Sequence, residues 1–119
     1  VISHEKGRPL AGLIVRKESK GHGTNQYVEG LSNFKPGDPV AMVEDVVTTG
    51  LSSRQAIAAV EAEGGIVVGE VALVDRSAGE VDLGVPFYPL VSINFPVYEA
   101  DAVPPELAAI PAIKPGSRK

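Results

Sequence analysis

The sequence contains no cysteine and no tryptophan, only three phenylalanines and three tyrosines, and no excess of basic residues. Without cysteine the chain forms no disulfide and uses no thiol chemistry; the compartment stays open, with the cytoplasm as the default expectation. A formal net charge of −4 argues against a nucleic-acid partner. No apolar run approaches the length of a membrane span and no signal peptide is visible, so we expect no membrane partner.

What the chain does contain is the composition of one globular domain. Hydrophobic residues make up 44% and charged residues 22% of its 119 residues, which is enough for a modest core. We therefore expect a single domain over residues 1–119. The sequence opens at Val1 in the middle of a helical pattern and without a methionine, so we also expect it to be the carboxyl-terminal portion of a longer chain.

Runs of apolar and β-branched residues alternate with turns and one helical pattern. They predict strands over residues 10–15, 40–43, 66–74 and 85–93. The S-x-x-Q pattern from Ser52 to Gln55 predicts a capping box at the start of a helix, which Gly64 and Gly65 end. Continuous apolar strands joined by a helix predict an α/β fold with an open, mostly parallel sheet.

The remaining segments are predicted as connections. The polar, glycine-containing residues 16–30 predict a long loop, and residues 34–39 predict a turn. Pro86 and Pro89 place the last strand near an edge of the sheet, since proline cannot donate a hydrogen bond to a neighbouring strand. The tail is expected to hold one short helix over residues 106–110.

The segment that follows the strand at residues 40–43 carries the most chemistry. Glu44 and Asp45 are expected to lie at the carboxyl end of that strand, where open α/β sheets bind ligands. A glycine-containing turn then leads into the helix, whose N-terminus offers free N–H groups and partial positive charge to a phosphate. The acids suit hydroxyl groups or a developing cation. Together these features predict a sugar-phosphate site.

This motif, EDVVTTG between a strand and a helix, resembles the phosphoribosyl diphosphate (PRPP) motif of type I phosphoribosyltransferases. The resemblance implies a Rossmann-like core with helices flanking the sheet. It implies that Glu44 and Asp45 hold the ribose hydroxyls and stabilise the oxocarbenium-like centre. It also implies a PRPP-binding segment formed by Val46, Val47, Thr48, Thr49, Gly50, Leu51 and Ser52. Leu51 departs from the pattern, in which a small residue is common, and we expect this to be tolerated.

A second motif lies in the predicted loop. The run RKESKGHG resembles the catalytic loop of the orotate phosphoribosyltransferases, with Arg16, Lys17, Lys20 and His22 at the matching positions. The resemblance implies that these four side chains contact the diphosphate, and that Lys20 and His22 act in catalysis with Glu44 and Asp45. It further implies a homodimer in which the loop around Lys20 reaches the neighbouring subunit.

The third motif is Arg76, which follows the strand at residues 66–74. It matches the position of an arginine that binds the orotate carboxylate in that family, and Thr48 is implied as a second orotate contact. The substrates would be PRPP and orotate, with Mg²⁺ carried by the PRPP oxygens and no direct metal ligand in the protein. Orotidine 5′-phosphate and diphosphate would be the products, in pyrimidine synthesis.

Two alternatives use the same fold. One is a phosphoribosyltransferase for a purine base, and the other is a non-enzymatic PRPP-binding regulator, which would have no need of Lys20. The family's diphosphate-binding loop, first core strand and amino-terminal hood have no counterpart in the sequence. We therefore expect these 119 residues alone to self-associate and to show little or no turnover.

Overall fold

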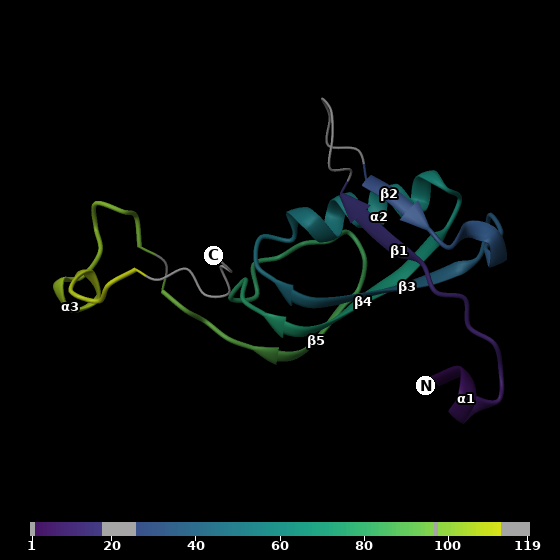
Figure 1. The fold of residues 1–119 in the computed structure, drawn as a ribbon, viewed down its shortest axis with the longest axis horizontal. Coiled ribbons are helices and arrows are strands. Elements are labelled where there is room, and N and C mark those ends of the chain that lie inside the picture. The colour runs from purple at the N-terminus through teal and green to yellow at the C-terminus, as the bar shows by residue number, and fades with distance from the viewer. Residues whose placement is uncertain (1, 18–25, 97, 113–119) are drawn as a thin grey trace, which may run out of the picture.

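The computed structural model, which describes residues 2–17, 26–96 and 98–112, contains a three-stranded parallel sheet with one long helix against it (Figure 1). In chain order the elements are α1 (Ile2–Lys6), β1 (Ile14–Lys17), β2 (Gln26–Glu29), the 3₁₀ helix η1 (Leu31–Asn33), β3 (Pro39–Val47), α2 (Leu51–Ala62), β4 (Ile66–Asp75), β5 (Phe87–Ser92) and α3 (Pro105–Ala108). The predicted α/β fold with a parallel sheet is confirmed.

The sheet has the order β3-β4-β5, with both pairs parallel. Its register pairs Val47 with Asp75 and Asp75 with Ser92, so that the carboxyl ends of the three strands lie side by side. β5 is an edge strand, as its prolines predicted: Pro89 lies within it, opposite Ala72 of β4. This shared carboxyl edge is where the predicted residues from Glu44 to Ser52, and Arg76, fall.

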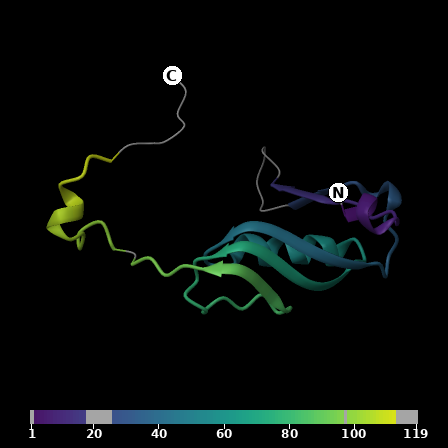
Figure 2. The same ribbon diagram turned by 90° about the horizontal axis from the view of Figure 1, so that it is seen from below.

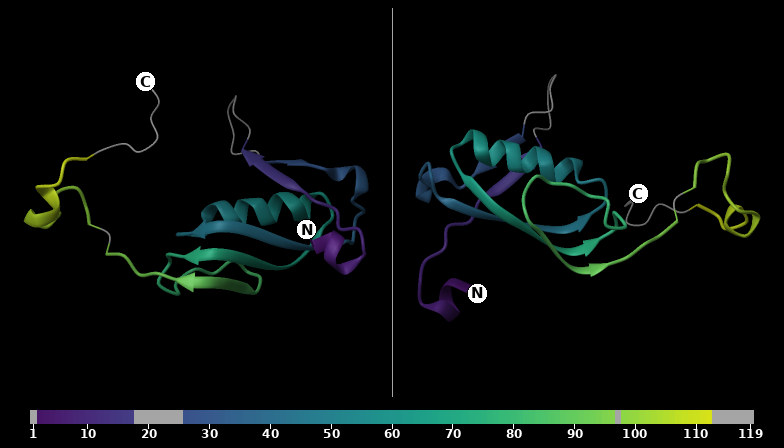
Figure 3. Two further views of the ribbon diagram at one scale, coloured as in Figure 1. Left: turned by 60° about the horizontal axis from the view of Figure 1, so that its bottom comes forward. Right: turned by 180° about the vertical axis from the view of Figure 1, so that it is seen from behind.

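One face of the sheet carries the core. Ile57 and Val60 of α2 pack with Val67 of β4 and with Leu83 from the loop before β5, and all four are buried. The Ile57 and Val60 side chains define the face of α2 that packs on the sheet. In Figure 3 α2 lies along one side of the sheet, and the β1–β2 pair packs against the same helix.

The opposite face of the sheet is uncovered among the described residues. Val43 is 82% exposed, and Leu73, Tyr88 and Leu90 on the neighbouring strands are also exposed. The apolar run at residues 40–43 is therefore covered on one side only. Side chains alternate between the two faces of a strand, and only the face toward α2 is covered in this part of the chain.

The segment at residues 10–30 also departs from the prediction. The strand expected over residues 10–15 begins only at Ile14, and it continues through Arg16 and Lys17, which were assigned to a loop. β1 pairs antiparallel with β2, from Ile14 opposite Glu29 to Lys17 opposite Gln26. Half of the residues in these two strands are polar or charged, which a strand with one face open to solvent tolerates, so an apolar run does not mark their full length.

The short helices α1 and α3 lie away from the sheet (Figure 1 and Figure 2). α1 ends at Lys6, in keeping with the helical pattern at the start of the sequence, and α3 falls within one or two residues of the helix expected over residues 106–110. The turn predicted at residues 34–39 is confirmed, with Gly37 at a φ of 93° and the Asp38 N–H donating to the Lys35 carbonyl. No helix in the described ranges is long and apolar enough to cross a bilayer.

Candidate functional site

The acid pair lies inside β3 and not after it. The ladder between β3 and β4 continues through Glu44 to Val47, so the expectation that the strand ends at residue 43 was wrong. Because neighbouring side chains in a strand point to opposite faces, Glu44 lies on the α2 side and is half-buried, whereas Asp45 is exposed. The two carboxylates are therefore adjacent in sequence but differ in their surroundings.

These surroundings shift the two pKa values in opposite directions. Burial raises the pKa of Glu44, and the neighbouring carboxylates of Asp45 and Glu70 add to that rise, while the Asp45 N–H, which donates to Glu44 Oε1 at 3.0 Å, opposes it. The pKa of Asp45 is lowered by its hydrogen bond to the Glu44 side chain and by the Val46 N–H, which donates to Asp45 Oδ1 at 2.7 Å. Asp45 is therefore the stronger acid of the pair.

The helix after the turn begins differently from the prediction. α2 starts at Leu51, and its N-cap is Gly50, which adopts a φ of 75°. Because this residue is a glycine, it has no side chain with which to cap the helix. The capping box predicted for Ser52 and Gln55 was wrong, because Ser52 is already the second residue of the helix. The Thr49 hydroxyl instead accepts the Leu51 N–H at 3.3 Å.

This start leaves a row of backbone donors unused. Among the described residues, no hydrogen bond is made by the N–H groups of Thr48, Thr49, Gly50, Ser52 and Ser53. The first four N–H groups of any helix lack intrahelical partners, and here a side chain, that of Thr49, satisfies only the Leu51 N–H. The turn therefore presents a cluster of free donors at the positive end of a helix.

The free donors border a hollow of about 140 Å³ at the carboxyl edge of the sheet. It is lined by Glu44, Val46, Val47, Thr48, Thr49, Gly50, Leu51, Ser52 and Ser53. The structure thus brings together Glu44 and the whole predicted segment from Val46 to Ser52. Asp45 does not line the hollow. Chemically, this arrangement can accept a phosphate on the N–H groups and a hydroxyl on the Glu44 carboxylate.

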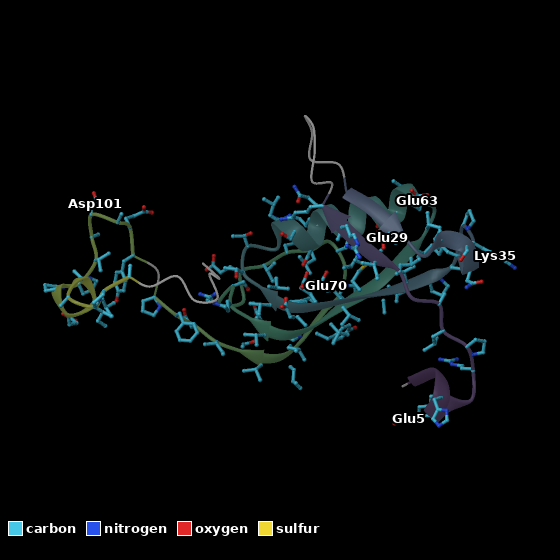
Figure 4. All side chains as sticks on the ribbon, in the orientation of Figure 1. Glu5, Glu29, Lys35, Glu63, Glu70 and Asp101 are labelled. Carbon is cyan, nitrogen blue, oxygen red and sulfur yellow. The ribbon has the colours of Figure 1, made fainter. Side chains whose placement is uncertain are left out.

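Sequence reasoning missed two residues beneath this hollow. Ser53 and Glu70 are 4% and 1% exposed, and the Ser53 hydroxyl donates to Glu70 Oε1 at 2.6 Å. Figure 4 shows Glu70 between the sheet and α2. The available signal was a single acid inside the otherwise apolar run of residues 66–74.

The predicted loop cations lie apart from the hollow or outside the described residues. Arg16 and Lys17 are exposed on β1 and do not line it, and the Arg16 Nε lies 3.1 Å from Glu29 Oε1 in an ion pair. β1 runs in the same general direction as the sheet strands (Figure 1). Lys20 and His22 fall outside the described residues.

Arg76 directly follows β4 at the same edge of the sheet. Its N–H donates to the Val47 carbonyl at 2.8 Å, which ties the end of β4 to the end of β3. Its exposed guanidinium carbon lies 5.6 Å from the centre of the Phe95 ring, within the range of a cation–π contact. Arg76 lies at the same edge of the sheet as the hollow but does not line it.

The described residues contain no cluster of three or more histidine or carboxylate side chains that could hold a metal ion. A divalent cation at this edge would therefore need most of its oxygen ligands from a bound molecule, as Mg²⁺ commonly takes them from phosphates.

Comparison with known proteins agrees with this geometry. The chain is 58% identical over 118 residues to an orotate phosphoribosyltransferase of Novosphingobium aromaticivorans, 60% identical over 119 residues to one of Sphingopyxis alaskensis, and 56% identical over 119 residues to one of Caulobacter vibrioides. These matches cover 99–100% of the chain, which spans about 60% of the length of these relatives. No protein-family model matches the chain.

Solved structures give the same result. A crystal structure of orotate phosphoribosyltransferase from Aeropyrum pernix is 34% identical with a TM-score of 0.59, covering 77% of this chain and 51% of that one. An adenine phosphoribosyltransferase from Rhodothermus marinus is 25% identical with a TM-score of 0.51, covering 74% and 52%. Over its whole length, the chain is therefore a homologue of the orotate phosphoribosyltransferases and has the type I phosphoribosyltransferase fold.

Proposed function

We propose that this chain provides the phosphoribosyl-binding part of an orotate phosphoribosyltransferase. The reaction transfers the phosphoribosyl group from PRPP to N1 of orotate, which gives orotidine 5′-phosphate and diphosphate. The observation that carries this proposal is the hollow where Glu44 and a row of free N–H groups meet, in a chain homologous to that family.

The backbone from Thr48 to Ser52 would hold the 5′-phosphate. Its free N–H groups and the positive end of α2 match a phosphate in charge and in hydrogen-bonding capacity. Glu44 and Asp45 would accept hydrogen bonds from the ribose hydroxyls, and their negative charge would stabilise the positive charge that develops on the ribose as the diphosphate leaves. No covalent intermediate is needed for this reaction.

Cations from the β1 region would contact the diphosphate. Arg16 and Lys17 are exposed at the carboxyl end of β1, and Lys20 and His22 follow them in the sequence. Positive side chains near the leaving diphosphate would stabilise its charge as the bond breaks. We further propose a homodimer in which Lys20 acts in the site of the neighbouring subunit.

Orotate would be bound by Thr48 and Arg76. A guanidinium group matches a planar carboxylate because it can donate two parallel hydrogen bonds. Arg76 is exposed and its only contact with a charged or aromatic group among the described residues is with Phe95, so its donors remain available. Mg²⁺ would enter with PRPP and supply charge neutralisation to the phosphate oxygens, and the expected compartment is the cytoplasm.

An equilibrium titration of the chain distinguishes this proposal from the purine alternative. Orotidine 5′-phosphate should bind more tightly than adenosine 5′-monophosphate, because both fill the phosphate hollow but only one carries a carboxylate for Arg76. Inorganic phosphate serves as the control for binding of any anion. Equal affinity for all three would contradict the proposal, and preference for the adenine nucleotide would favour a purine enzyme.

A further inference from the structure

Ser53 and Glu70 form a polar pair in an otherwise apolar layer of the molecule. It lies between α2 and the sheet, in the layer otherwise occupied by Ile57, Val60 and Val67. In the sheet, Glu70 is opposite Met42 on one side and Phe87 on the other. A carboxylate in such a place costs stability unless its oxygens are bonded, and an apolar side chain would fill the same space without that cost.

Glu70 is only partly bonded. Its Oε1 accepts the Ser53 hydroxyl, but Oε2 is buried and has no hydrogen-bond partner among the described residues. Glu44 is its diagonal neighbour on the same face of the sheet, since Glu44 pairs with Ala72. A second carboxylate nearby adds repulsion to the cost of burial. The stability of the fold therefore does not explain why an acid occupies position 70.

The position of Ser53 indicates what the pair does. Ser53 is the third residue of α2 and lines the hollow, and its own N–H is one of the free donors. The N-cap residue, Gly50, has no side chain that could hold this first turn in place. The bond from Ser53 to Glu70 therefore ties the first turn of α2 to the sheet, from beneath the hollow.

We propose that Glu70 is a positioning residue for the phosphate-binding turn, acting through the Ser53 hydroxyl. Glu70 does not touch the ligand. It fixes the first turn of α2, and with it the free N–H groups that border the hollow, at a cost in stability. The proposal rests on the phosphate cradle proposed above, and it predicts that binding and stability respond in opposite senses to loss of the carboxylate.

The test compares four variants with the unsubstituted chain. Glu70→Met removes the acceptor but keeps the volume, Ser53→Ala removes the donor, and Glu70→Gln keeps an acceptor oxygen. Glu61→Gln, an exposed acid on the same helix, controls for loss of charge. Each protein is examined by titration with ribose 5-phosphate, by urea unfolding and by hydrogen–deuterium exchange over residues 48–54.

Glu70→Met and Ser53→Ala should each weaken ribose 5-phosphate binding about tenfold. Exchange over residues 48–54 should rise in both, while the urea midpoint of Glu70→Met stays the same or increases. The double variant should be no worse than either single one, because both remove the same bond. Glu70→Gln should stay within about threefold of the unsubstituted chain, and Glu61→Gln should match it.

Two results would overturn the inference. One is unchanged exchange and affinity in Glu70→Met, and the other is a fall in the urea midpoint that parallels the loss of binding, which would make Glu70 merely structural. The exchange measurement needs no ligand, so it separates this inference from the proposed function. Raised exchange in a chain that binds no ribose 5-phosphate would support the positioning role and contradict the phosphate cradle.

Discussion

The hollow at the end of β3 and the β1–β2 ribbon would bind their ligands by different means. In the hollow, the donors are backbone N–H groups that the path of the chain leaves free between β3 and α2. In the ribbon, the charges are on long exposed side chains, and one of them, Arg16, is already paired with Glu29. A backbone site is fixed by the order strand, turn, helix, whereas a side-chain site depends on which partner each charge takes.

The turn between β3 and α2 can be disturbed without changing any ligand-binding side chain. Gly50→Ala should lower the free energy of unfolding by about 2–4 kcal/mol and abolish phosphate binding. Gly50 has a φ of +75°, and an added Cβ would lie 2.4 Å from Val81 Cγ2 and 2.9 Å from Leu83 Cδ2. Urea unfolding and a titration with ribose 5-phosphate measure the two effects.

Gly79 offers a matched control. It also has a positive φ, of +81°, but an added Cβ there would meet no atom within 4 Å. Gly79→Ala should therefore cost only the backbone strain, about 1–2 kcal/mol, and leave binding intact. If Gly50→Ala were no more harmful than Gly79→Ala, the close packing assigned to the turn would be incorrect.

The next effect concerns Arg76, a side chain at the same edge of the sheet. Arg76→Ala should weaken orotidine 5′-phosphate by about 1.5–3 kcal/mol, as for the loss of a charged hydrogen bond. Ribose 5-phosphate, which has no base, should bind as before. Competition titrations measure the affinity for each of the two ligands. An equal loss of affinity for both would show that Arg76 does not contact the base.

Substitution of Lys20 tests the proposed cation contacts with the diphosphate, and its expected effect on binding is smaller than that of Arg76→Ala. Lys20→Ala should weaken PRPP by about five- to tenfold, because one cation near the diphosphate is lost. Ribose 5-phosphate, which lacks the diphosphate, should be unaffected. The control is Lys35→Ala, since Lys35 lies in the turn before β3, at the other end of the sheet. Similar losses from both variants would indicate a general effect of net charge.

The smallest expected effect concerns Glu44 and Asp45, and it appears in how the free energy of unfolding depends on pH. The raised pKa of Glu44 means that its contribution to stability is present below the ordinary value of 4.5 and is lost as pH rises through the folded pKa. Asp45 has a lowered pKa, so its contribution is present above 3.8 and is lost as pH falls through the folded value. The two acids should therefore respond oppositely to neutralisation.

Glu44→Gln should be as stable as the unsubstituted chain or more stable near neutral pH, and this difference should disappear at acid pH. Asp45→Asn should be less stable near neutral pH. Urea unfolding at a series of pH values from about 3 to 7 measures both changes. Destabilisation of the same sign in both variants would contradict the assignment of different environments to the two carboxylates.

The sequence predicted the backbone-built part of the molecule well. The strand, turn and helix around residues 40–62, the parallel sheet and the edge position of β5 all followed from apolar runs, glycines and prolines. These features depend on local conformation and on the hydrophobic pattern, which a sequence displays directly. The exact end of β3 did not follow, because the ladder to β4 continues through two acids that local propensity would exclude.

Features that depend on tertiary contacts were not predictable. β1 and β2 become strands because they pair with each other and rest on α2, although half of their residues are polar or charged. The Ser53–Glu70 bond joins residues 17 positions apart, and only the fold brings them together. The N-cap is Gly50 and not the expected Ser52, because the positive φ of Gly50 turns the chain into the helix two residues earlier. The S-x-x-Q pattern gives no information about this turn.

Binding of the sugar phosphate by the backbone of residues 48–53 can be followed at each amide by NMR. Amide ¹H–¹⁵N shifts of the chain are followed during titration with ribose 5-phosphate. The largest changes should fall on the free N–H groups from Thr48 to Ser53, while Arg16 and Lys17 on β1 stay unchanged. Changes concentrated on β1, or spread evenly over the surface with none at the turn, would contradict the account.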